Sequence, residues 1–188
     1  DVNLRHEIVA MIIRETLTYT SNDAQTYLGQ FRSRWLSNHR DIARDVAHCF
    51  SGRNFNGGTI GIAWLSVICD SIFNGLGFGV VQDINGFNCR TDLSAHELGH
   101  NWSAQHCDPC PTTMRSFLGC FNQFGGTSIN SITNHRNSRN CLSTAAPAND
   151  DCADAEVVSD GAYVFTTESA TGEETPDCDG LSMRKDIW

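Results

Sequence analysis

The stretch His96-Glu97-Leu98-Gly99-His100-Asn101-Trp102-Ser103-Ala104-Gln105-His106 contains the residues that set the interpretation of this chain. On a helix, residues four apart lie on one face, so His96 and His100 point the same way. Two imidazoles from one turn can bind one zinc ion, while Glu97 can reach a water molecule at the metal without being a ligand. His106 completes the set only if the chain turns sharply near Ser103. Three histidine nitrogens leave a fourth position for water, which is typical of a catalytic zinc site.

Other interpretations of these residues compete with a catalytic zinc site. A structural zinc site usually has four protein ligands and favours cysteine, and Cys107 and Cys110 directly after His106 keep that alternative open. An iron oxygenase would need a carboxylate in its facial triad, whereas three histidines favour a zinc hydrolase. A non-catalytic, zinc-stabilised adhesion or binding protein is a further alternative. The intact Glu97 argues against it, because a binding protein has no need of that residue.

The histidine motif resembles the metzincin signature, His-Glu-x-x-His-x-x-Gly-x-x-His followed by a methionine turn, with Met114 as the candidate methionine. Residues 44–69 (RDVAHCFSGRNFNGGTIGIAWLSVIC) resemble the segment before the active-site helix of adamalysin or reprolysin-type metzincins. Ser103 stands where the family has a glycine of positive φ, so we expect a slightly strained but intact turn there. The resemblance covers about residues 1–142 and implies a zinc metallopeptidase.

The resemblance also implies a fold and a mechanism. The fold would be an α/β domain with a mixed twisted sheet, an active-site helix and a C-terminal helical subdomain, its first strand and helix missing before Asp1. The protein would be a secreted endopeptidase that hydrolyses peptide or protein substrates through a zinc-activated water, with Glu97 as general base. Met114 would lie beneath the metal. A sheet-edge strand would bind the substrate as an added antiparallel strand. Its residues are Thr59, Ile60, Gly61, Ile62, Ala63 and Trp64.

Hydrophobic periodicity predicts alternating helices and strands, which indicates an α/β layer fold. Apolar residues at three-to-four spacing predict a helix over residues 24–38, with Ser21, Asn22 or Asp23 as the N-cap. The remaining expected elements are a doubly buried strand over residues 59–68, a strand over residues 78–82, a helix capped by Thr91 or Asp92 that runs to about Asn101, and a helix over residues 128–141.

Nine cysteines in 188 residues indicate disulfides and an oxidising compartment. The family resemblance implies a bridge between Cys69, at the end of the expected edge strand, and Cys141, at the end of the last helix. The other expected pairings are Cys120 with Cys107 or Cys110, Cys49 with Cys89, and Cys152 with Cys178.

Charge and composition separate a body from a tail. Residues 1–148 carry 11 acidic residues and 11 arginines, so the net charge of −9 belongs to the tail. A neutral body with an acidic appendage argues against nucleic-acid binding, which requires a basic surface. No apolar run approaches the roughly 18 residues that a membrane span requires.

The domain boundaries follow from the same change in composition. We expect a catalytic domain over residues 1–142, a linker over residues 143–149, and the truncated start of an acidic, β-rich accessory module over residues 150–188. Calcium binding by the acidic tail is conceivable, but no EF-hand spacing supports it. The abrupt start and end of the chain indicate a piece of a longer protein, whose export signal would lie outside it.

Overall fold

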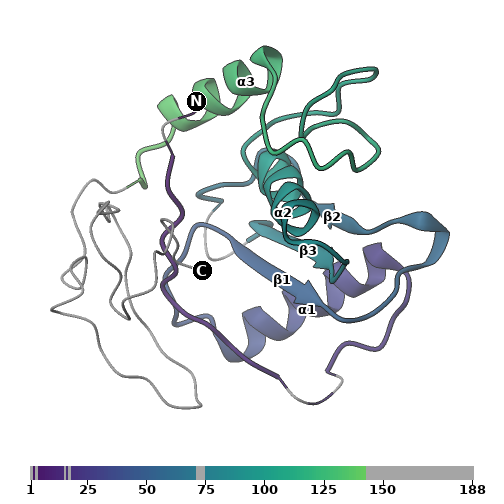
Figure 1. Cartoon of the computed structure of the whole chain (residues 1–188). Coiled ribbons are helices and arrows are strands. Elements are labelled where there is room, and N and C mark those ends of the chain that lie inside the picture. The colour runs from purple at the N-terminus through teal and green to yellow at the C-terminus, as the bar shows by residue number, and fades with distance from the viewer. Residues whose placement is uncertain (1, 3, 15, 17, 71–74, 143–188) are drawn as a thin grey trace, which may run out of the picture. The chain divides into compact units, whose positions relative to one another are not determined.

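The computed structural model describes residues 2, 4–14, 16, 18–70 and 75–142 (Figure 1). The chain forms two compact units, one of residues 1–2 and 17–141 and the other of residues 3–16 and 142–188. The expected linker, accessory module and Cys152–Cys178 bridge lie outside the described residues. The helices and strands of the described residues all belong to the first unit. In chain order they are α1 (Ala24–Asn38), β1 (Ala47–Ser51), a short 3-10 helix (Asn56–Gly58), β2 (Gly61–Ala63), β3 (Phe78–Gln82), α2 (Phe87–Asn101) and α3 (Gly126–Asn137).

The three strands form a mixed sheet in the order β1-β3-β2. β1 runs parallel to β3, with Ala47 opposite Phe78, and β2 runs antiparallel to β3, with Gly61 opposite Val81. β2 therefore lies at an edge of the sheet within the described part of the chain. The mixed α/β class expected from the sequence is observed in this small three-stranded form.

The hydrophobic core lies between α1 and one face of the sheet. Successive strand residues point to opposite faces, and Phe78 and Val80 of β3 are fully buried in the same cluster as Leu28 and Phe31 of α1. The rings of Phe31 and Phe78 meet edge-to-face with their centroids 5.4 Å apart. Asp23 caps α1, since its side chain accepts a hydrogen bond from the Thr26 N–H at 2.8 Å. The helix has the bounds that its periodicity predicts.

The opposite face of the sheet carries α2, as Figure 1 shows. Gly79 faces this helix, and a Cβ built on it would lie 3.4 Å from the Asn101 Oδ1 atom. The Asn101 side chain is completely buried and donates from Nδ2 to the carbonyl oxygens of Trp64 (2.8 Å) and Phe78 (3.2 Å). The last residue of α2 is thereby fixed to β3 and to the residue that follows β2.

The observed sheet differs from the prediction in two segments. The strand expected over residues 59–68 is regular only over Gly61–Ala63 and is half-buried, because the chain leaves the sheet at Ser66, which has a φ of 60°. β1 is not among the elements predicted from the sequence. Its parallel pairing with β3 depends on a distant partner, so local sequence gave a poor indication of it.

Both later helices also begin earlier than predicted. α2 starts at Phe87, so both expected cap residues lie inside the helix. The Thr91 hydroxyl donates to the Phe87 carbonyl inside the helix, and the Asp92 carboxylate is engaged elsewhere. The last helix, α3, begins two residues before Ser128 and ends before Cys141. Among the described residues, no helix is long and apolar enough to cross a membrane.

Candidate metal centre and active site

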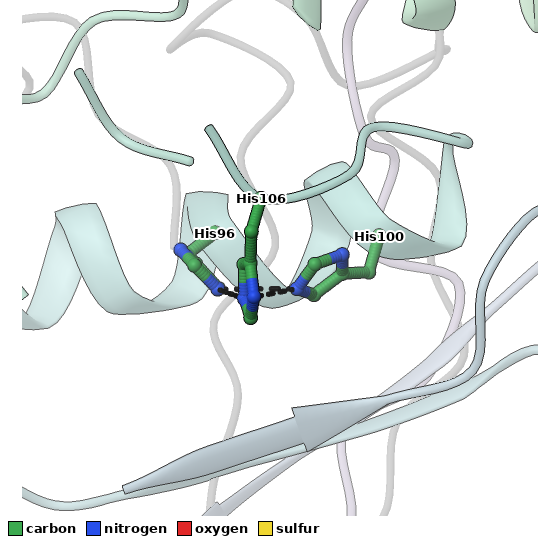
Figure 2. A group of neighbouring side chains, drawn as sticks. All are labelled: His96, His100 and His106. Atoms are coloured by element: carbon green, nitrogen blue, oxygen red, sulfur yellow. Dashed lines mark hydrogen bonds between the residues drawn. The ribbon is translucent and has the colours of Figure 1, made fainter. Parts of the chain in front are cut away.

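Three histidine side chains converge beside α2. His96 and His100 lie one turn apart on the helix, and His106 comes from the loop that follows it (Figure 2). Each of the three Nε2···Nε2 distances is 3.1 Å. His106 is exposed to solvent, whereas His96 and His100 are partly buried. The three nitrogens therefore surround one point that is open to solvent on the His106 side.

The Nδ1 atoms of His96 and His100 make hydrogen bonds that determine whether each Nε2 atom carries a proton or a lone pair. His96 Nδ1 lies 2.7 Å from the Thr113 carbonyl oxygen, and His100 Nδ1 lies 2.8 Å from the Ala104 carbonyl oxygen. A carbonyl can only accept, so each ring carries its proton on Nδ1 and, when neutral, a lone pair on Nε2. Burial lowers the pKa of His96, and burial together with the neighbouring His96 lowers the pKa of His100 to about 4. Two neutral rings thus face each other with lone pairs, an arrangement that a cation between them would stabilise.

The spacing of the nitrogens fits zinc. Three nitrogens bound tetrahedrally to one zinc ion at about 2.0–2.1 Å would lie about 3.3–3.4 Å apart. The observed separations of 3.1 Å are close to this value. The three side chains also form a group whose ligand atoms could all bind one metal ion. Donor type, protonation and spacing agree, so these residues could hold zinc.

A tight turn after α2 brings His106 back to the helix. Ser103 has a φ of 83°, the positive value expected from the family's glycine. Its N–H donates to the His100 carbonyl at 2.9 Å, and the Ala104 N–H donates to the Gly99 carbonyl at 2.8 Å, which closes the helix end. The Ser103 hydroxyl also shares a 2.9 Å hydrogen bond with the hydroxyl of Ser66, in the segment after β2.

Glu97 lies on the side of α2 that faces the sheet. It is 4% exposed, and burial raises the pKa of its carboxyl to about 8. A Cβ built on Gly61 would lie 2.3 Å from Glu97 Oε1, so only the absence of a side chain at Gly61 leaves room for the carboxyl group. The Oε2 atom is buried and has no hydrogen-bond partner in the described structure. A buried, unpartnered carboxylate oxygen is costly, which is typical of a group that meets its partner in a bound complex.

Met114 is completely buried on another side of α2. A Cβ built on Gly99, between the two helical histidines, would lie 2.6 Å from the Met114 sulfur atom. The Met114 carbonyl accepts a hydrogen bond from the Cys107 N–H at 2.9 Å, so the methionine segment pairs with the residue after His106. Met114 therefore packs against α2 at Gly99, between the two helical histidines, and its role as the methionine turn beneath the metal stays a prediction.

A comparison with protein families agrees with this arrangement. A family model of reprolysin type, described as metallopeptidase family M12, matches residues 1–152. The chain belongs to this metallopeptidase family. Members of the family depend on zinc, so the protein is a zinc metallopeptidase whose substrates are proteins or peptides.

The metallopeptidase contains three disulfides among its described residues, and two of them correct the predicted pairings. Cys69 bonds to Cys141, as the family resemblance implies. Cys120 bonds to Cys89 and not to Cys107 or Cys110, which bond to each other. The predicted Cys49–Cys89 bridge is therefore wrong: Cys49 lies in β1 opposite Val80, whereas Cys89 lies in the first turns of α2. Long-range pairing of this kind depends on tertiary contacts that cysteine spacing does not encode.

The expected substrate-binding strand of the metallopeptidase is only partly regular. Gly61, Ile62 and Ala63 form β2, while Thr59 and Ile60 precede it and Trp64 follows it. The pairing with β3 nevertheless continues on both sides, because the Gln82 N–H donates to the Ile60 carbonyl (2.7 Å) and the Trp64 N–H donates to the Phe78 carbonyl (3.4 Å). These residues therefore form one edge segment, although its regular part is short.

Two residues that organise this site were not assigned a role from the sequence. Asn101 is completely buried and fixes the end of α2 to the sheet. Asp92, considered only as a helix cap, is completely buried next to Thr113. A short polar residue inside a helix has low helix propensity, and that mismatch was the one signal in the sequence.

Proposed function

We propose that this zinc metallopeptidase is a secreted endopeptidase of the metzincin type, with His96, His100 and His106 as zinc ligands and Glu97 as general base. The observation that carries the proposal is the buried Glu97 carboxyl, which has an unpartnered oxygen and directly follows one of three convergent histidines. A structural zinc site needs no such group. The Cys107–Cys110 disulfide also withdraws the thiolates that a closed structural site would use.

A bound zinc ion would polarise the scissile carbonyl and lower the pKa of a water molecule toward about 7. Glu97 would accept a proton from the attacking water and then transfer it to the leaving amine. Burial raises the proton affinity of this carboxyl above that of a solvated one, which suits a group that takes up and releases a proton near neutral pH. The Nδ1 hydrogen bonds of His96 and His100 would hold both rings with Nε2 toward the metal.

The edge of β2 is the proposed substrate-binding strand. In antiparallel pairing, alternate residues bond to the neighbouring strand. Ile60 and Trp64 bond to β3, so alternation directs the main-chain N–H and C=O groups of Gly61 and Ala63 away from it. An extended peptide could pair with these groups as an added antiparallel strand. Gly61 would then hold the substrate backbone directly beside Glu97, because the two residues are in contact.

Secretion is the part of the proposal that concerns location. Three disulfides in one compact unit are compatible with an oxidising, extracellular compartment, since cytosolic proteins rarely keep such bonds.

The decisive experiment measures zinc content and peptide cleavage together. The purified protein is expected to bind one zinc ion and to cleave casein, with activity lost on chelation and restored by zinc. Glu97→Gln removes the base but preserves the shape of the side chain, so it should retain zinc and lose about 10²–10⁴-fold in kcat. Asp83→Asn makes the same chemical change at an exposed carboxylate paired with Arg90, and should leave kcat unchanged. Near-normal turnover by Glu97→Gln would exclude the assigned role. A zinc-loaded protein that cleaves nothing would favour the non-catalytic binding alternative.

A further inference from the structure

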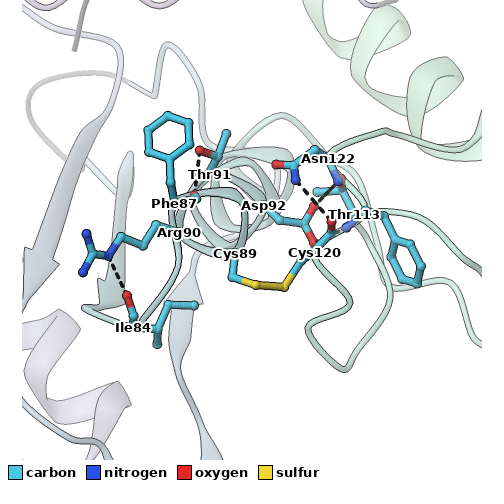
Figure 3. Close-up of a disulfide and its surroundings, with 10 residues drawn as sticks. Ile84, Phe87, Cys89, Arg90, Thr91, Asp92, Thr113, Cys120 and Asn122 are labelled. Carbon is cyan, nitrogen blue, oxygen red and sulfur yellow. Dashed lines mark hydrogen bonds between the residues drawn. A yellow bond between two sulfur atoms is a disulfide. The ribbon is translucent and has the colours of Figure 1, made fainter.

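A buried carboxylate lies one turn before the first histidine of the metal centre. Asp92 of α2 is 0% exposed and four residues ahead of His96. Its Oδ1 atom accepts hydrogen bonds from the Thr113 hydroxyl (2.7 Å) and the Asn122 N–H (3.0 Å), and its Oδ2 atom accepts one from the Phe121 N–H (3.1 Å). Figure 3 shows Asp92 of α2 beside Thr113 and Asn122.

All three groups that donate hydrogen bonds to Asp92 are neutral, so no positive charge among them compensates for burying this carboxylate. Burying a carboxylate is unfavourable unless donors replace its lost water, and an apolar side chain would usually serve the core as well or better. The benefit of Asp92 therefore lies in what its hydrogen bonds position. They fix Thr113, at the methionine turn, and residues 121–122, next to the Cys89–Cys120 disulfide, against the first half of α2.

Thr113 connects this carboxylate to the metal centre. Its hydroxyl donates to Asp92, and its carbonyl oxygen accepts the Nδ1–H of His96 at 2.7 Å. Its N–H donates to the Gln123 carbonyl at 2.8 Å, so both ends of the residue are held. The carbonyl that sets the tautomer and orientation of the His96 ring is thus kept in place by the Asp92 carboxylate.

We infer that Asp92 is a positioning residue for the metal ligand His96, acting through Thr113. It orients the His96 ring so that Nε2 faces His100 and His106 before any metal binds. Outer hydrogen-bond partners of this kind typically change metal affinity by about 10–100-fold when they are removed. This inference rests on the proposed assignment of His96 as a ligand, but it does not depend on catalysis.

The test compares the zinc affinity of variants by competition with a chromogenic chelator. In Asp92→Asn, one carboxylate oxygen becomes an amide NH₂ that must face an N–H or hydroxyl donor, which breaks the network without changing side-chain volume. Thr113→Val removes only the hydroxyl and keeps the carbonyl that His96 uses. Both variants are expected to bind zinc about 10–100-fold more weakly than the parent protein. Asp83→Asn, at an exposed carboxylate, should bind zinc with unchanged affinity.

A second measurement separates positioning from a purely structural role. In the metal-free protein, the ¹⁵N resonances of the His96 ring should report the Nδ1–H tautomer in the parent, and a mixture of tautomers in Thr113→Val and Asp92→Asn. If folded variants show the parent tautomer and the parent zinc affinity, with only a lower melting temperature, the inference is overturned. If Asp92→Asn does not fold, Thr113→Val alone tests the inference. In that variant the Asp92 carboxylate still accepts hydrogen bonds from the N–H groups of Phe121 and Asn122. Protein that binds zinc normally but cleaves no peptide would contradict the proposed function and leave this inference standing.

Discussion

The two sides of α2 hold the candidate active site in different ways. On one side the helix lies against a sheet, and Glu97 is packed against Gly61 of β2 and fixed by shape. On the other side lie residues 102–125, which contain no regular helix or strand. There Asp92, Thr113 and the Cys89–Cys120 disulfide fix the loop to the helix through specific bonds.

The comparison teaches how a loop can place a side chain without the backbone pairing of a sheet. β2 and β3 satisfy their backbone groups with each other, so little more is needed than a close approach of helix and strand. The loop has no such ladder, and its backbone N–H groups at residues 121 and 122 are satisfied by the buried Asp92 carboxylate. Packing therefore places Glu97, the proposed base, whereas hydrogen bonds place His96, a proposed zinc ligand.

The largest stability effect is expected from the loop side, at Met114. Met114→Ala should lower the free energy of unfolding by about 2–5 kcal/mol, because it leaves a cavity beside Gly99 under the helix. Met114→Leu conserves volume and should cost less than about 1.5 kcal/mol. Urea denaturation of the zinc-loaded protein measures both variants. Equal stabilities of the alanine variant and the parent would show that the loop side does not depend on packing at this point.

The next largest effect is expected at Gly61, and it tests whether close packing against β2 positions Glu97. Gly61→Ala puts a methyl group where Glu97 Oε1 now lies, 2.3 Å from the new Cβ, so the carboxyl group must move. A displacement of about 1 Å can cost on the order of 10²-fold in rate, and we expect a loss of that size in kcat with zinc content unchanged. KM should change little, because the backbone groups of β2 remain.

The matched controls for Gly61→Ala are two other glycines. A Cβ at Gly52 would meet nothing within 4 Å, so Gly52→Ala should behave as the parent in every assay. A Cβ at Gly79 would have His48 (3.2 Å), Ala63 (3.4 Å) and Asn101 (3.4 Å) as its nearest neighbours, so it crowds the same sheet at other residues than Glu97. In both Gly79→Ala and Gly61→Ala, activity could fall only as much as the amount of folded protein falls. That result would mean that Gly61→Ala destabilises the sheet and does not displace Glu97.

The smallest effect is expected at the turn that joins the two sides. Ser103→Ala keeps the positive φ and removes the hydrogen bond to Ser66, so it should destabilise the protein by about 0.5–1 kcal/mol. Ser103→Gly loses the same bond but relieves a backbone strain of about 1–2 kcal/mol, and should be more stable than the alanine variant. Thermal unfolding measures the order of the two. The reverse order would mean that the turn is not strained at Ser103.

Prediction from the sequence succeeded where local spacing controls the structure. The helix over residues 24–38 follows from apolar periodicity and is observed, and Asp23, one of the three expected N-cap residues, caps it. The convergence of His96, His100 and His106 follows from a helical repeat and one forced turn. Prediction failed where a structure depends on residues that are distant in the chain. β1 pairs with β3, and Cys89 bonds to Cys120 because residues 120–122 fold back onto α2.

The sequence by itself determined the chemistry that this chain carries, because the spacing of three histidines and one glutamate on a helix and its turn is a local property. The tertiary structure alone decided how those groups are held. The contact of Gly61 with Glu97 and the hydrogen bonds of Asp92 to residues 113, 121 and 122 join segments more than 20 residues apart in the chain. Such contacts depend on which surfaces meet when the chain packs, and short-range sequence patterns do not encode that pairing.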